Sequence, residues 1–200
     1  HPRENEVSNT NKKSKDVTNI KEVEIEGKKI IDTVNLNLND LTTTCMEKSP
    51  EIDNFIEDSD DVIEGVVESV EYFDCNGLPW SCLHVKTMDS LFGNIKKREK
   101  VEIYVMEGYT FSDYTQKYLI EYTGDERGMH QIGDKSIYIL SKESPDSVFG
   151  ENVYMRTYSC FSEYRYDELK NKYIEYDFKG DTKESSRDSL VNLIKNYFGN

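Results

Sequence analysis

Four cysteines and two internal histidines are the residues of this chain best suited to chemistry. Cys75, Cys82 and His84 lie close together with the spacing Cys-x6-Cys-x-His, whereas His130 stands apart. Thiolates and imidazoles bind zinc, but strong zinc sites combine pairs of closely spaced ligands, and this spacing supplies no obvious fourth ligand. The sequence therefore predicts no metal site and no cofactor.

The same cysteines raise the question of a disulfide. Cys75 and Cys82 flank a short loop, and in an oxidising compartment a bond between them would staple the hairpin. The Asn76-Gly77 pair favours a two-residue turn, which would instead set Cys75 opposite Leu78. Two alternatives stay open: a Cys75–Cys82 disulfide, which needs facing Cβ atoms, and free buried thiols.

His84 and His130 are the candidate general acids or bases. Neither lies in a nucleophile-elbow, zincin or Cys-His signature. Serine and aspartate are plentiful, so a triad assembled from distant residues is an alternative. The sequence assigns no catalytic residue, and an envelope-associated hydrolase that uses His84 or His130 is the second hypothesis for the function.

Aromatic residues point to a binding surface instead. Alternation places Tyr104 on the non-core face of its strand, and it places Tyr154, Arg156 and Tyr158 together on one face of another. OB-type barrels bind extended ligands across strand faces with such side chains. These four residues are the predicted ligand-binding positions. The alternative is that tyrosine is simply common on half-exposed strands.

Two helices and a series of strands must position these residues. Capping residues and apolar spacing predict a short helix beginning near residues 49–51 and an amphipathic helix ending near residue 198. Between them, period-2 segments predict strands at Val62–Phe73, Leu83–Met88, Lys100–Met106, Tyr118–Tyr122, Ser136–Leu140, Asn152–Phe161 and Tyr173–Phe178. The fold class is mainly β with minor α, and closure into a small barrel would remove exposed strand edges.

Composition divides the chain into a leader and a folded domain. Residues 1–20 are polar and mixed in charge, and apolar residues alternate in the stretch 21–46. We expect residues 1–46 to form a disordered leader or tether with one or two peripheral strands. Residues 47–200 are the predicted barrel domain.

The charge of the chain limits its partners. The net charge is -14, so the surface repels phosphate backbones and anionic lipid headgroups. We therefore expect no nucleic-acid partner, and membrane contact only through a removed lipid anchor or signal segment. Such a surface attracts cations, basic peptides or basic proteins. Acidic residues are densest at 47–74, where a solvated acidic face is expected.

A recurring order of strands and turns runs through the predicted domain. It includes SDDVIEGVV at 59–67, Asn-Gly at 76–77, Leu-Phe-Gly at 91–93, the strand and glycine at 101–108, and GDKSIYIL at 133–140. This order resembles that of uncharacterised secreted lipoproteins of clostridia and bacilli. The resemblance implies an OB-like five-stranded barrel with a terminal helix, closed or partly open, and it assigns no catalytic residue.

Location and function follow as expectations. A bias towards Asn, Lys, Ile and Tyr is typical of AT-rich genomes, and with the resemblance it predicts a secreted or cell-surface lipoprotein of a low-GC Gram-positive bacterium. The first hypothesis is a non-enzymatic, extracytoplasmic binding module for a basic peptide, a basic protein or a cation. The third, after the hydrolase, is a structural accessory domain of an envelope complex.

Overall fold

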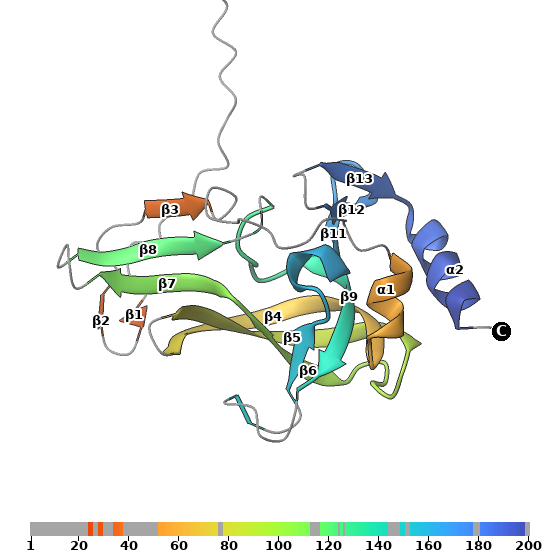
Figure 1. Ribbon diagram of the computed structural model, residues 1–200, viewed down its shortest axis with the longest axis horizontal. Helices are drawn as coiled ribbons and strands as arrows, with labels where there is room; N and C mark the ends of the chain where they lie inside the picture. The colour runs from red at the N-terminus through yellow and green to blue at the C-terminus, as the bar shows by residue number, and fades with distance from the viewer. Residues whose placement is uncertain are drawn as a thin grey trace, which may run out of the picture.

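The computed structural model describes most of the chain from residue 52 onward. The described residues are 24–25, 28–29, 34–37, 52–75, 78–112, 117–123, 125, 127–143, 149–150, 153–177 and 181–198. Strands predominate among them, as the sequence predicted, and two helices pack at one end (Figure 1).

Five strands close into a small barrel. They are β4 (Asp61–Cys75), β5 (Leu78–Phe92), β6 (Lys100–Val105), β9 (Lys135–Lys142) and β10 (Tyr154–Arg156), and four of them, β4, β5, β6 and β9, are labelled in Figure 1. Neighbours pair in the order β4–β5–β6–β10–β9, and β9 pairs back onto β4. The pairs are antiparallel except for β6 with β10, which is parallel. This closed order confirms the predicted OB-like barrel.

Alternate apolar residues fill the barrel interior. On β5, Leu83 and Val85 point inward, and their partners in this core include Ile63, Val67, Val101, Ile103, Val105, Tyr138 and Leu140. Successive side chains of a strand point to opposite faces of the sheet. The residues between the core positions, Cys82 and His84 on β5 and Glu102 on β6, therefore project from the outside of the barrel.

A second core lies between the barrel wall and the two helices. α1 (Ile52–Glu57) and α2 (Arg187–Tyr197) bury Phe55, Ile56, Leu190, Val191 and Ile194 against Ile137 and Ile139 of β9. Arg187 donates hydrogen bonds to Glu64 of β4 from two nitrogens, at 2.8 and 2.7 Å. Both bonds end on Glu64 Oε2, and this charge-assisted contact fixes the start of α2 on the barrel. Both predicted helices are confirmed.

The remaining strands surround the barrel. β11 (Glu163–Asp167), β12 (Lys172–Tyr176) and β13 (Thr182–Ser185) extend the sheet outward from β9, and β7 (Glu107–Ser112) pairs with β8 (Lys117–Thr123). β3 (Val34–Asn37) joins β8 in parallel, and β1 (Glu24–Ile25) pairs with β2 (Lys28–Lys29). The rest of the predicted leader lies outside the described residues.

The structure differs from the predicted strands in two respects. The predicted strand Asn152–Phe161 is instead the short β10, followed by a 3-10 turn at Ser159–Ser162. Ser159 has a positive φ of 55°, a conformation that ends an extended strand. In addition, β7, β11 and β13 had not been predicted from the sequence.

Candidate functional site

A cluster of potential metal ligands lies on the outside of the barrel. The register sets Glu71 opposite Cys82 and Cys82 opposite Tyr104, and it sets His84 opposite Glu102. Paired residues of adjacent strands point to the same side of the sheet, so these side chains meet. We call the surface formed by Glu71, Phe73, Trp80, Cys82, His84, Glu102 and Tyr104 the outer face.

His84 is the centre of this cluster. Its Nε2 atom is 3.1 Å from Glu71 Oε1 and 3.9 Å from Cys82 Sγ, and its Nδ1 atom is 3.9 Å from Glu102 Oε1. The side chains of His84, Glu71 and Glu102 are 28%, 71% and 48% exposed. The cluster is therefore open to dissolved ligands, although Cys82 itself is buried.

The Cys82 thiol is not activated as a nucleophile. Burial raises the pKa of Cys82 to about 11, and the charges of Glu102 and Glu71 raise it further, against the opposing effect of a hydrogen bond with Tyr104. Catalytic cysteines need a lowered pKa because the thiolate is the reactive form. The order thiol, imidazole, carboxylate is present, but its electrostatics favour a neutral thiol.

Aromatic rings pack at the hairpin end of the outer face. Phe149, from the segment between β9 and β10, stacks on Tyr104 with 4.7 Å between ring centroids and lies 4.7 Å from Trp80. Phe73 adds edge contacts to Tyr104 and Phe149. The stacked contact sets the Tyr104 and Phe149 ring faces against each other, so the cluster forms an apolar border of the outer face.

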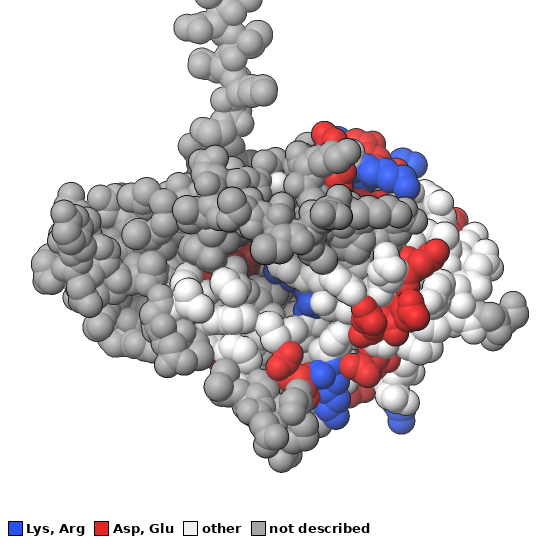
Figure 2. Space-filling view, viewed as in Figure 1, with Lys and Arg blue, Asp and Glu red and all other residues white. Residues whose placement is uncertain are grey.

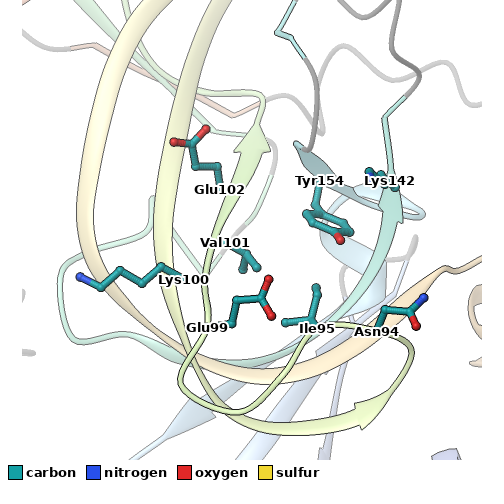
Figure 3. A pocket seen from close by; sticks show the side chains of 8 residues that line it. All are labelled: Asn94, Ile95, Glu99, Lys100, Val101, Glu102, Lys142 and Tyr154. Carbon is teal, nitrogen blue, oxygen red and sulfur yellow. The ribbon is translucent and has the colours of Figure 1, made fainter.

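A hollow of about 510 Å³ is lined by β6, the loop before it, Lys142 and Tyr154 of β10, and it borders the barrel interior (Figure 3). Its lining residues are Asn94, Ile95, Glu99, Lys100, Val101, Glu102, Lys142 and Tyr154. Asp61 holds the loop beside it by accepting hydrogen bonds from the backbone N–H groups of Asn94 and Ile95. Glu102 lines the hollow and also faces His84, so this residue borders both the hollow and the cluster.

The structure separates the four predicted ligand-binding residues. Tyr104 lies on the outer face, and Tyr154 lines the hollow. Arg156 instead donates a hydrogen bond to the buried Glu163 at 2.7 Å. Tyr158 packs on Phe55 of α1. β10 ends at Arg156, so alternation no longer governs Tyr158, and two of the four residues border the candidate site.

The other internal histidine has similar neighbours in a buried setting. His130 Nδ1 is 2.8 Å from Glu107 Oε1, and Nε2 is 2.8 Å from Glu163 Oε1, with the imidazole 0% exposed. Glu163 also accepts hydrogen bonds from Ser136 and Arg156. We call this group, with its further members Asp125, Arg127 and Arg165, the buried ionic network.

Charge within the buried ionic network is mutually stabilised. Burial alone would raise the pKa of Glu163, but His130, Arg165 and Arg156 hold it well below its usual range. Burial and Arg165 disfavour charge on His130, yet the two glutamates raise its pKa above the usual value. His130 thus has the carboxylate neighbours that the hydrolase hypothesis requires, but its ring is enclosed and a substrate cannot reach it.

The cysteines adopt the arrangement that the turn favours. Residues 76–77 lie outside the described part, but the flanking strands pair with Cys75 opposite Leu78, while Cys82 lies opposite Glu71. Cys82 and Cys160 are buried and form no disulfide. The register therefore sets Cys75 and Cys82 on different residue pairs of the hairpin, four pairs apart.

Acidic side chains also gather around α1, as the space-filling view shows (Figure 2). Asp53, Glu57, Asp58 and Asp60 are exposed there. This agrees with the solvated acidic face expected in the segment 47–74. The α1 surface is a second region of negative charge, which any test of cation binding must distinguish from the outer face.

Sequence reasoning missed Glu71, Glu102 and Phe149 as parts of the site. Glu71 was within reach of the sequence, because counting back from a two-residue Asn76-Gly77 turn pairs it with Cys82. Glu102 requires the register of β5 with β6, which a longer connection leaves undetermined. Phe149 reaches the outer face from a loop, for which no periodic signal exists.

Comparison with known proteins gives no further guide. No family model matches the chain, and no curated protein and no solved structure matches it significantly. The resemblance to secreted lipoproteins therefore stays a prediction. Among the described helices, none has the length and apolar character needed to cross a bilayer.

Proposed function

We propose that this protein is a non-enzymatic binding module, held outside the cell, that takes positively charged ligands on the outer face of its barrel. The ligands are lysine or arginine side chains of a basic peptide or protein, or a cation. OB-like barrels commonly bind their ligands on this part of the sheet, across the second and third strands, which here are β5 and β6. The resemblance to secreted lipoproteins supports the extracytoplasmic location.

The observation that carries the proposal is the pairing of the outer-face carboxylates. Among the ion pairs of the described residues, Glu71 and Glu102 pair with a half-exposed histidine, and no lysine or arginine neutralises them. On the same sheet, Glu68 is paired with Lys100 at 2.7 Å and with Lys86 at 4.0 Å. Glu71 and Glu102 are therefore available to an incoming cation, and Glu68 is not.

Calorimetric titration with a lysine-rich peptide tests the proposal. We expect the full chain to bind the peptide, with an affinity that falls several-fold as salt rises from 0.05 to 0.5 M, because ions screen exposed charges within about 10 Å at 0.1 M. The double variant E71Q/E102Q should bind more weakly. E68Q is the matched control and should bind like the wild type.

Two results would refute the proposal. One is the absence of binding to the lysine-rich peptide at low salt. The other is binding that neither salt nor E71Q/E102Q weakens. A glutamate-rich peptide of equal length should not bind, which confirms that charge rather than peptide backbone is recognised.

The hydrolase hypothesis is the second candidate because Cys82, His84 and Glu102 follow one another in the order of a nucleophile, a base and an orienting carboxylate. Three features make it weaker. The pKa of Cys82 is raised, Glu71 rather than the thiol is the nearer group to His84 Nε2, and His130 is enclosed. A structural accessory role is compatible with binding to a partner through the same outer face.

A further inference from the structure

We infer that Cys82, His84 and Glu102 bind one divalent metal ion of the zinc class, with Glu71 as the fourth ligand. This names one ligand of the proposed binding face, and it rests on the proposed function for the location of the site alone. Sulfur, imidazole nitrogen and carboxylate oxygen are the three donor types that zinc accepts in proteins.

Three of the four proposed donor atoms lie close enough together for a single ion, and Glu71 is near this group through its contact with His84. One ligand atom each from Cys82, His84 and Glu102 lies within 4.8 Å of the others. Bond lengths of about 2.0 Å to nitrogen or oxygen and about 2.3 Å to sulfur place tetrahedral ligand atoms about 3.3–3.6 Å apart. The separations of His84 Nε2 from Glu71 Oε1, 3.1 Å, and from Cys82 Sγ, 3.9 Å, lie on either side of that range.

The β-sheet fixes the backbone positions of two proposed ligands, Cys82 and His84, whereas the side chains of Glu71 and Glu102 can rotate. Cys82 and His84 are two residues apart on β5, inside the barrel wall, so their backbone positions are fixed by β4 and β6. Glu71 and Glu102 approach from these neighbouring strands with exposed, rotatable side chains. Glu71 and Cys82 face Nε2 of His84, whereas Glu102 Oε1 lies 3.9 Å from Nδ1, so the Glu102 side chain has to rotate to reach an ion bound at Nε2.

Binding is balanced in protons and charge. The Cys82 thiol releases its proton to solvent, its sulfur lone pair forms the bond to the metal, and no oxidation or reduction takes place. With His84 as a neutral ligand, the thiolate and two carboxylates surround the divalent ion and leave a single net negative charge. The ion also relieves the repulsion between Glu71 and Glu102, which lie on opposite sides of His84.

Other clusters of potential metal ligands lack either the mixture of donor types or access to solvent. The buried ionic network brings a histidine and glutamates together, but arginines occupy the carboxylates and the site is enclosed. The acidic residues around α1 offer carboxylates alone. Within the described residues, the outer face is the place where a thiol, an imidazole and carboxylates come together in reach of solvent.

Zinc titration of the reduced, metal-free full chain, in competition with a chromophoric chelator, tests the inference. We expect one zinc ion per chain. H84Q should weaken binding by at least about a hundredfold, and E102Q and E71Q by at least about tenfold, since even outer-shell changes at zinc sites cost 10–100-fold. E68Q, which removes a carboxylate from the same sheet, should bind zinc within twofold of the wild type.

Cobalt as a spectroscopic substitute identifies the sulfur ligand. The wild type and C75S should show the near-ultraviolet thiolate-to-cobalt charge-transfer band, and C82S should lack it. C75S is a suitable control because Cys75 pairs with Leu78, four residue pairs from the Glu71–Cys82 pair. If C82S fails to fold, two results still test the site. The band should be present in the wild type and in C75S, and it should be absent in H84Q, whose substitution is at the exposed part of the site.

The inference is overturned if no stoichiometric zinc binds, if H84Q binds as tightly as the wild type, or if the cobalt band depends on Cys75 rather than Cys82. Measuring peptide binding in the presence of a metal chelator separates failure of the zinc site from failure of the proposed binding of positively charged peptides. Peptide binding without zinc binding refutes the metal site alone, whereas zinc binding without peptide binding refutes peptide recognition alone.

Discussion

His84 and His130 each lie between two glutamates, and their surroundings make them different kinds of site. Around His130, Arg156 and Arg165 contact the same Glu163 carboxylate, so its charge is compensated within the protein. Around His84, the carboxylates of Glu71 and Glu102 face solvent with a histidine as their partner. Similar residue types thus form an internally compensated ionic network in the interior and a candidate binding site on the surface.

Burial decides what each cluster contributes. An enclosed charge that loses its partner is costly, because nothing replaces the lost contact, whereas exposed pairs contribute little since water solvates either member. The buried ionic network joins β7, β9, β10 and β11, so it links the peripheral strands to the barrel. We expect it to control stability, and the outer face to control binding.

The largest effect is expected from E163Q, which removes the shared negative charge of the buried ionic network. His130, Arg156 and Arg165 would then be buried without their common partner. Breaking such a buried pair costs about 3–5 kcal/mol of unfolding free energy. Urea unfolding followed by circular dichroism measures the loss. A loss below about 1 kcal/mol would show that the network does not hold the fold.

The pH dependence of stability sharpens the comparison. The pKa of His130 is raised in the folded state, so its stabilisation is complete below the ordinary value of 6.5 and is lost as pH rises through the folded pKa. The pKa values of Glu107 and Glu163 are lowered, so their stabilisation is present above 4.5 and is lost as pH falls through the folded values. Stability from this network should therefore be greatest between about 4.5 and 6.5.

Urea unfolding at pH 5 to 9 measures this profile. Above pH 6.5 the wild type should lose up to about 1.4 kcal/mol per pH unit through His130. H130Q should be less stable at pH 6 and should show a flatter decline on the alkaline side. A variant with the same alkaline slope as the wild type would assign that slope to other groups.

The smallest effect is expected from E102Q, the corresponding substitution beside the exposed histidine. Glu102 is half exposed and 3.9 Å from His84, so the unfolding free energy should change by less than about 1 kcal/mol. The same urea titration measures it beside E163Q. Equal destabilisation by E102Q and E163Q would contradict the distinction between a stabilising buried ionic network and an outer face that serves binding.

The sequence predicts the barrel because its core strands alternate. Val101, Ile103 and Val105 are inward-facing apolar residues separated by polar ones, and the structure bears this out. β11 was missed for the opposite reason, because its buried residues include Glu163 and Arg165, which a sequence pattern treats as exposed. The charged residues of the buried ionic network therefore interrupt the apolar alternation by which β11 could have been recognised in the sequence.

The candidate site was predictable only in part. Cys82 and His84 stood out because they are close in the sequence, but their carboxylate neighbours come from other strands. Arg156 was predicted on a binding face because its counter-ion Glu163 lies in the missed strand β11. In both cases the missing information is strand register, which depends on tertiary contacts rather than on local pattern.

Chemical-shift mapping tests the central claim that the outer face binds positively charged ligands. The lysine-rich peptide would be titrated into isotope-labelled protein while the backbone amide signals are followed. We predict that the largest shifts fall on β5 and β6, around Cys82, His84 and Glu102. Shifts centred on the acidic residues around α1, or shifts of His130 and Glu163 without changes on β5 and β6, would contradict the claim.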